Sequence, residues 1–167
     1  MSDAAQASTA RTVGWEAPRV RLAVQGDAPA VTAAVRELLA ELGASPPSTP
    51  AMEGAAKQLI DGDHAGAVLV AESEGTLVGV LAVSWQVAIH VPGSYALIQD
   101  LWVQRAWRSR AIGGALLEAL VGLARERGLD RIEVGLPRDG FAAIAATERF
   151  YRANGFVALG QRMRMTL

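Results

Sequence analysis

Hydrophobic side chains recur along the chain with two different periods, and each period predicts a kind of element. A period of about 3.6 residues is typical of an amphipathic helix, whereas alternation or a short apolar run is typical of a strand. A helix is predicted between Asp27, a residue type that favours the N-cap, and Gly43, which favours a helix end. The clearest helix is predicted over residues 112–127. Its apolar face comprises Ile112, Leu116, Leu117, Leu120, Val121 and Ala124.

The remaining segments complete the order strand, helix, helix, three strands, helix, strand, helix, strand. Hairpins followed by a β-α-β unit predict a single mixed-sheet α/β domain with helices on both faces. Residues 1–18 have few large apolar side chains and are expected to form a flexible tail, which leaves residues 19–167 as the domain. Residues 156–167 have room for one strand or a short hairpin. Helices are also predicted over residues 50–61 and 141–154, and strands over residues 20–24, 67–72, 77–87, 95–103 and 131–136.

Composition narrows the class of protein. Of the 167 residues, 51% are hydrophobic and 20% are charged, which argues for a folded chain. A net charge of -1 argues against nucleic-acid binding through a basic surface. The absence of cysteine excludes disulfides, thiolate metal sites and a cysteine nucleophile, and with only two histidines we expect no metal. No apolar run approaches the roughly 20 residues of a membrane span. We therefore expect a cytoplasmic protein without a membrane partner.

The loop before the strong helix has the character of a phosphate site. Residues 108–115 read Arg-Ser-Arg-Ala-Ile-Gly-Gly-Ala and follow a predicted strand. The unpaired N–H groups at a helix start and the helix dipole attract phosphate, glycines let a ligand approach closely, and arginines supply counter-charge. A Walker A loop is excluded because the only lysine, Lys57, lies elsewhere. A plain glycine-containing helix start with solvated Arg105, Arg108 and Arg110 would give the same pattern, so both interpretations remain open.

Four segments together resemble the GNAT superfamily of acyl-CoA-dependent N-acyltransferases over about residues 20–167. Residues 108–113 are similar to the acyl-CoA signature [QR]-x-x-G-x-[GA], and residues 100–103 to the central-strand pattern E/D-L-x-V. Residues 150–156 are similar to [FL]-Y-x-x-x-G-F, and residues 70–79 to the family's second hairpin. The resemblance implies a mixed, mostly antiparallel sheet of six to seven strands with a central bulged strand, and about four helices on both faces.

Three positions depart from the family pattern. Ala111 stands where the signature has its first glycine, and we expect it to take ordinary helical or bridge dihedrals while keeping its N–H group. Ile144 stands where many members carry an asparagine that contacts the pantetheine arm. The C-terminal segment is also short. Ala111 and Ile144 keep a second function open, in which the chain is a non-catalytic acyl-CoA-binding sensor or interaction module.

The resemblance implies an enzyme that transfers an acetyl group from acetyl-CoA to a primary amine, directly within a ternary complex. An alkyl amine with a pKa of about 10.4 must lose a proton before it attacks the thioester. Asp100 is the candidate general base, although a structural carboxylate is the alternative; Glu72 and Glu133 are weaker candidates. Tyr151 matches the family's acid that protonates the leaving thiolate, although a packed aromatic side chain is the alternative.

The resemblance also implies which residues bind the coenzyme. The backbone of residues 101–103 would pair with the pantetheine arm and donate an N–H group to the thioester carbonyl, while the side chain of Trp102 is expected in the core. The acceptor would be an amine of a small molecule or a protein, and a homodimer is compatible with the family. The residues expected to bind acetyl-CoA are Leu101, Trp102, Val103, Arg108, Ser109, Arg110, Ala111, Ile112, Gly113, Gly114 and Ala115.

Overall fold

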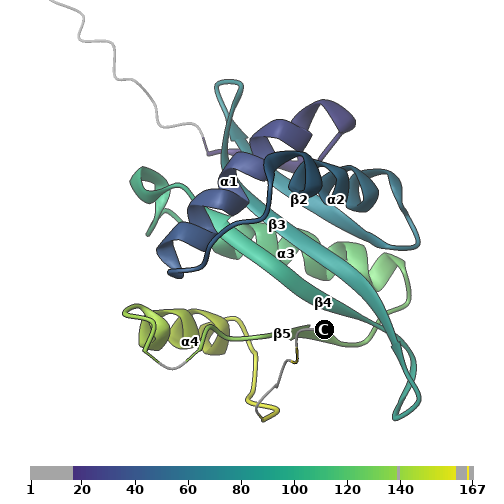
Figure 1. Ribbon diagram of the computed structural model, residues 1–167. Coiled ribbons are helices and arrows are strands. Elements are labelled where there is room, and N and C mark those ends of the chain that lie inside the picture. The colour runs from purple at the N-terminus through teal and green to yellow at the C-terminus, as the bar shows by residue number, and fades with distance from the viewer. Residues whose placement is uncertain (1–16, 139, 161–164, 166–167) are drawn as a thin grey trace, which may run out of the picture.

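The computed structural model describes residues 17–138, 140–160 and 165 (Figure 1), so the expected N-terminal tail lies almost entirely outside the described residues. Its elements confirm the predicted order as far as the last helix. The helices and strands are β1 (Arg19–Leu22), α1 (Ala28–Glu41), α2 (Thr49–Asp61), β2 (Gly66–Ser73), β3 (Thr76–Ala88), β4 (Val91–Val103), α3 (Ile112–Glu126), β5 (Ile132–Val134) and α4 (Ile144–Ala153). Two short 3-10 turns, η1 (Gln25–Asp27) and η2 (Arg105–Trp107), precede α1 and follow β4.

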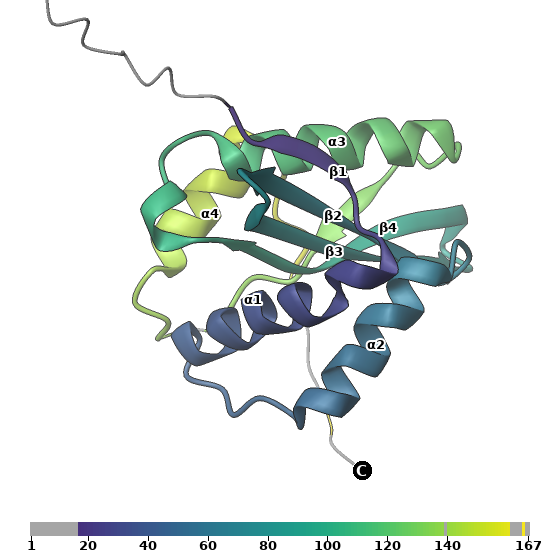
Figure 2. The ribbon, with the colours of Figure 1, turned by 90° about the horizontal axis from the view of Figure 1, so that it is seen from above.

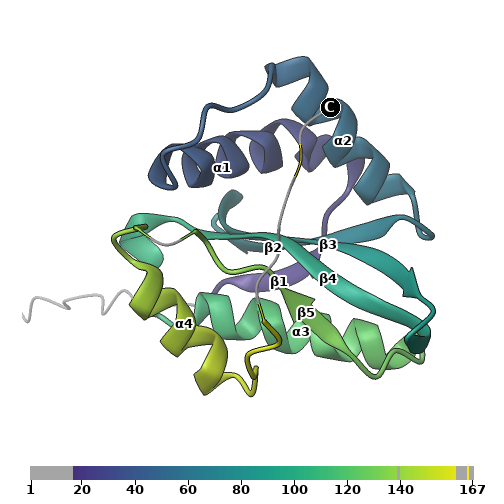
Figure 3. The ribbon, with the colours of Figure 1, turned by 60° about the horizontal axis from the view of Figure 1, so that its bottom comes forward.

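The sheet lies between two layers of helices. Its strands follow the order β1-β2-β3-β4-β5; the first four are antiparallel and β5 runs parallel to β4. Figures 2 and 3 show α1 and α2 on one face, with α3 and α4 on the other. This confirms the mixed, mostly antiparallel architecture. The described residues form five strands rather than six or seven, since residues 156–160 form no strand and most of the expected final strand lies outside the described residues.

Two hydrophobic clusters fill the spaces between the layers. The alternation of side chains along β2 sends Val68 and Val70 toward α1 and α2, and Leu69 toward α3. Leu116 and Leu120 carry the predicted apolar face of α3 into the second cluster, and both are fully buried. The sheet is therefore held from both sides, and its strand β4 is fixed where it carries the candidate site.

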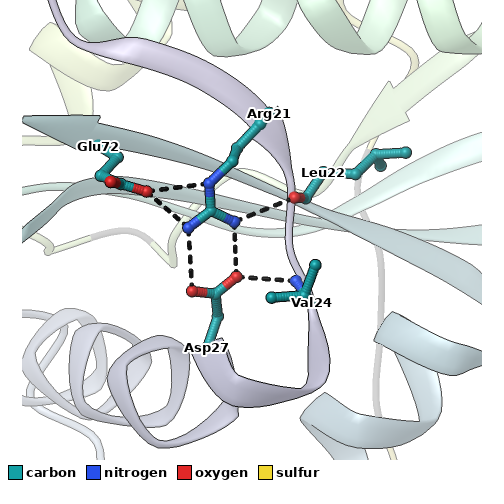
Figure 4. Close-up of polar contacts among 5 residues, drawn as sticks. All are labelled: Arg21, Leu22, Val24, Asp27 and Glu72. Carbon is teal, nitrogen blue, oxygen red and sulfur yellow. Dashed lines mark hydrogen bonds and ion pairs between the residues drawn. The ribbon is translucent and has the colours of Figure 1, made fainter. Parts of the chain in front are cut away.

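An ion-pair network joins the first strand to the start of α1 (Figure 4). The Arg21 guanidinium donates to Glu72 on β2 at 2.6 and 2.9 Å and to Asp27 at 2.7 and 3.1 Å. Asp27 occupies the predicted N-cap position of α1, but its carboxylate makes no capping bond to that helix and instead accepts the N–H of Val24 at 2.7 Å. Hydrogen bonding from Arg21 lowers the pKa of Asp27 despite its partial burial.

Candidate active site

A bulge in β4 opens the sheet next to β5. On the β3 side, Val83 pairs with Ile98 and Ala82 pairs with Asp100, so that Gln99 is the extra residue. The parallel pairing with β5 involves only Ala96, Leu97 and Ile98, and it ends at this bulge. Beyond it, residues 99–103 of β4 have no paired strand on that edge among the described residues. The predicted bulged strand is confirmed, and its backbone can accept an extended ligand as an added strand.

Asp100 stands directly after the bulge. Opposite residues of an antiparallel pair point to the same face, and its partner Ala82 belongs to the cluster beneath α1 and α2. Burial raises the pKa of Asp100 above its ordinary value, because the charged form is poorly solvated. Its carboxylate has no hydrogen bond or salt bridge to the described part of the chain. These are properties that suit a group that accepts a proton.

Tyr151 approaches from the other face of the sheet. It lies on α4 in the cluster beneath α3, is 7% exposed, and its ring makes edge contacts with Phe150 and Phe156 at centroid distances of 5.2 Å. Burial, and secondarily the negative charge of Asp100, raise the pKa of Tyr151 to about 12. The two groups that the sequence proposed for the chemistry are thus close enough to interact electrostatically. No described residue hydrogen-bonds the tyrosine hydroxyl.

The glycine-rich loop enters α3 through two left-handed residues. Ser109 has a φ of 62° and Ala111 a φ of 61°, so the expectation of ordinary helical or bridge dihedrals at Ala111 was wrong. A left-handed conformation at the N-cap is what glycine adopts without strain, which explains the residue that the family signature has there. The first helical bond runs from the N–H of Ala115 to the carbonyl of Ala111 at 2.9 Å. The N–H groups of Ile112, Gly113 and Gly114 therefore have no partner within α3.

The two glycines of this loop have different neighbours. A Cβ on Gly113 would lie 3.0 and 3.2 Å from the Phe150 ring, so its missing side chain admits α4 rather than a ligand. A Cβ on Gly114 would meet nothing within 4 Å. Close approach of a ligand to the backbone is therefore open at Gly114, and Gly113 fixes the helix that carries Tyr151.

Arg108 is already engaged by the protein. Its guanidinium donates to both carboxylate oxygens of Glu41, at 2.7 and 2.8 Å, and to the carbonyl of Val103 at 2.9 Å. Arg110 stacks instead on Trp107, with its guanidinium carbon 5.3 Å from the ring centroid. Of the three arginines expected to supply counter-charge, Arg105 and Arg110 remain exposed without a carboxylate partner in the described part of the chain. Glu41 was missed by sequence reasoning, because nothing local links residues 67 positions apart.

A groove of about 490 Å³ begins at the same helix start and lies within the size range of small-molecule sites. It follows one face of α3 to β5 and to the segment after α4. Glu118 and Asn154 add polar groups that the sequence pattern did not single out. Its lining residues are Ala111, Gly114, Ala115, Leu117, Glu118, Val121, Ile132, Asn154 and Phe156.

The other side chains considered for the site are held by contacts within the fold. Trp102 is 5% exposed beneath α1 and α2, which confirms the expected core position, and its indole N–H has no hydrogen-bond partner among the described residues. Of the two weaker carboxylate candidates, Glu72 is held by Arg21 and Glu133 lies 3.8 Å from Arg131, whereas Asp100 stands directly at the bulge. The described residues contain no group of three His, Asp or Glu side chains that could hold a metal ion. None of the described helices has the length and apolar character needed to cross a membrane.

Several solved structures of similar fold are named as acetyltransferases. An acetyltransferase candidate from Arthrobacter sp. FB24 is 28% identical, with a TM-score of 0.69 over 93% of this chain and 96% of that one. A ribosomal-protein-alanine N-acetyltransferase from Brucella melitensis biovar Abortus 2308 is 19% identical, with a TM-score of 0.70 over 90% and 99%. An aminoglycoside N-acetyltransferase in complex with CoA is 13% identical, with a TM-score of 0.75 over 93% and 98%.

These structures establish the fold, and the class of the chain follows from its sequence. The sequence model of the acetyltransferase (GNAT) family matches residues 33–156. The chain therefore belongs to the GNAT family and is an acyltransferase; members of this family use acetyl-CoA as co-substrate. No curated protein matches the sequence.

Proposed function

We propose that this protein is an N-acetyltransferase that moves the acetyl group of acetyl-CoA to a primary amine by direct attack within a ternary complex. The observation that carries the proposal is the opening between β4 and β5, with Asp100 at its edge and Tyr151 within electrostatic reach. A chain without cysteine has no cysteinyl acyl-enzyme route, which favours direct transfer.

The open edge of β4 and the start of α3 suit the two ends of acetyl-CoA. The unpaired backbone of Leu101, Trp102 and Val103 would hold the pantetheine arm and donate to the thioester carbonyl. The free N–H groups at Ile112, Gly113 and Gly114 would bind the diphosphate, next to exposed Ser109, Arg110 and Ala111. The adjoining groove, which Ala115 also lines, continues from the start of α3 toward β5 as a mostly apolar surface.

Asp100 would receive the proton that the amine loses. A carboxylate with a raised pKa holds a proton more tightly than an exposed carboxylate does. It is therefore a stronger base, and a general base works best when its pKa lies near the operating pH. Because Ala82, the partner of Asp100, faces α1 and α2, the amine would enter from that side of the sheet. The nitrogen then attacks the thioester carbonyl, and the carbon–sulfur bond breaks as the amide forms.

Tyr151 would donate to the departing sulfur. A phenol with a pKa of about 12 stays protonated throughout the neutral range, so the hydroxyl remains a hydrogen-bond donor there. Its hydroxyl is free of hydrogen bonds to the described residues and can turn toward the sulfur. Negative charge that develops on the sulfur would be stabilised by this bond.

The acceptor is an amine of a small molecule or of a protein. The structural relatives act on both kinds, an aminoglycoside in one case and the alanine of a ribosomal protein in another. A panel of aminoglycosides, polyamines, amino acids and short peptides therefore spans the relevant chemistry.

Initial-rate kinetics with the best amine test the direct route. Ternary-complex transfer predicts double-reciprocal lines that intersect when acetyl-CoA and amine are varied together. Parallel lines, together with an acetylated protein detected by mass spectrometry, would contradict direct transfer.

A further inference from the structure

The contact between Glu41 and Arg108 joins the last residue of α1 to the loop before α3. Both carboxylate oxygens accept from the Arg108 guanidinium, and the Nε atom of Arg108 also donates to the carbonyl of Val103, the last residue of β4. One terminal nitrogen of the guanidinium, Nη2, donates to both oxygens of Glu41, while Nε donates to Val103, so two different nitrogens fix the direction of the arginine. Arg108 is therefore tied to α1 and to β4 at once.

The loop that follows needs such support. Ser109 and Ala111 both have positive φ angles, and neither is a glycine. Non-glycine residues keep this conformation only where surrounding contacts hold them in it. Arg108 immediately precedes Ser109, and its three hydrogen bonds anchor the loop at its β4 end. The bond from the N–H of Ala115 to the carbonyl of Ala111 anchors the loop at its α3 end.

We propose that Glu41 is a positioning residue for coenzyme binding. Through Arg108 it holds the loop so that the N–H groups at the start of α3 are aligned for the diphosphate before the ligand arrives, and Arg108 acts as a strut rather than as a phosphate ligand. The inference rests on the proposed function only in taking CoA as the ligand of this loop.

The two roles of Arg108 predict opposite effects of removing Glu41. If Arg108 were a phosphate ligand, Glu41 would compete with the phosphate for the guanidinium, and its loss would leave CoA affinity unchanged or raise it. If Arg108 is a strut, loss of Glu41 lets the loop relax and lowers CoA affinity. The sign of one change in affinity therefore separates the two roles.

Calorimetric titration of CoA into the full chain tests the proposal. We expect Glu41→Gln to weaken CoA binding about tenfold. The matched control is Glu37→Gln, which removes the same charge one turn earlier on α1 from an exposed side chain without a partner among the described residues. The control should bind CoA as the wild type does, and the unfolding temperatures of both variants should stay close to that of the wild type.

A double-mutant cycle gives the second readout. If Glu41 acts through Arg108, Glu41→Gln should add little to the loss of CoA affinity already caused by Arg108→Met. The Michaelis constant for acetyl-CoA should rise while kcat at saturating acetyl-CoA changes little. Equal affinities of Glu41→Gln and Glu37→Gln, tighter binding by Glu41→Gln, or additive losses would overturn the positioning role. A wild type that binds no CoA would instead refute the proposed function, and the positioning role with it.

Discussion

The raised pKa of Asp100 affects both the stability of the fold and the proposed proton transfer. Burial raises its pKa, so the folded chain holds this proton more tightly than the unfolded chain does. The stability that the protonated carboxyl contributes is fully present below the unfolded pKa. It is lost as the pH rises through the folded pKa, because the carboxylate must then be charged in a poorly solvated place.

Replacing this carboxyl with an amide should therefore raise stability and lower activity together. We predict that Asp100→Asn unfolds at a higher temperature than the wild type at pH 7, and that the difference shrinks toward pH 4. Thermal unfolding across this range measures the effect. A variant that is less stable at pH 7 would show that Asp100 is a structural carboxylate whose partners the substitution breaks.

Tyr151 should matter for turnover more than for coenzyme binding. We predict that Tyr151→Phe lowers kcat about tenfold or more, because a hydrogen bond to the leaving sulfur is lost, while CoA affinity remains near the wild-type value. The ring contacts with Phe150 and Phe156 persist in this variant, so the fold should be kept. A thiol-release assay measures kcat, and calorimetry measures the CoA affinity. An unchanged kcat would assign the tyrosine a packing role only.

Ala111 carries a backbone strain that glycine would relieve. A left-handed alanine costs about 1–2 kcal/mol, and glycine loses part of that gain through its freer unfolded state. We predict that Ala111→Gly raises the free energy of unfolding by about 0.5–1 kcal/mol, measured by denaturant titration. Ala33→Gly is the matched control at an exposed position inside α1, and it should lower that free energy by about 0.5–1 kcal/mol. Destabilisation by both variants would refute the strain at Ala111.

At the scale of elements, the Arg21 network holds β1, β2 and the start of α1 together. Its side chains are partly buried, with 25% of Arg21 and 14% of Asp27 exposed. If Arg21 is removed, the carboxylates of Asp27 and Glu72 lose their ion-pair partner, and water replaces that partner poorly in a partly buried place. We predict that Arg21→Met lowers the free energy of unfolding by about 1–3 kcal/mol. Arg152→Met is the control, because its pair with Glu148 is exposed and should cost less than about 0.5 kcal/mol. Similar losses of unfolding free energy in the two variants would show that the network stabilises the fold no more than an exposed ion pair does.

The hydrophobic pattern of the sequence predicted the helices and strands better than the turns and contacts that connect them. Helical periodicity located α3 because its apolar residues are local in sequence, and the structure begins that helix at the predicted Ile112. Strand β4 starts at Val91 rather than at residue 95, because pairing with β3 extends the hairpin beyond its apolar run. The left-handed turn at Ala111 escaped prediction because alanine gives no signal for it. The Glu41–Arg108 contact escaped because it depends on how α1 lies along the sheet.

At the scale of the whole molecule, the sheet between two helical layers places the two residues proposed for the chemistry on opposite faces of the sheet. Asp100 lies at the opening, opposite Ala82 of the cluster beneath α1 and α2, whereas Tyr151 belongs to the cluster beneath α3. The resemblance predicted these two residues, whereas the electrostatic influence of Asp100 on Tyr151 depends on how the fold arranges β4 and α4. Acid–base chemistry at this opening is the centre of the proposed function.

Amine-dependent release of CoA from acetyl-CoA, compared between the wild type and Asp100→Asn, tests that centre most directly. The account predicts release with at least one amine of the panel, at a rate that falls as the pH drops through the raised pKa of Asp100. It also predicts a loss of about 10²–10⁴-fold in Asp100→Asn while CoA still binds. If both proteins bind CoA but form free CoA from acetyl-CoA equally slowly with every amine, the chain is an acyl-CoA-binding module and the proposed catalysis is contradicted.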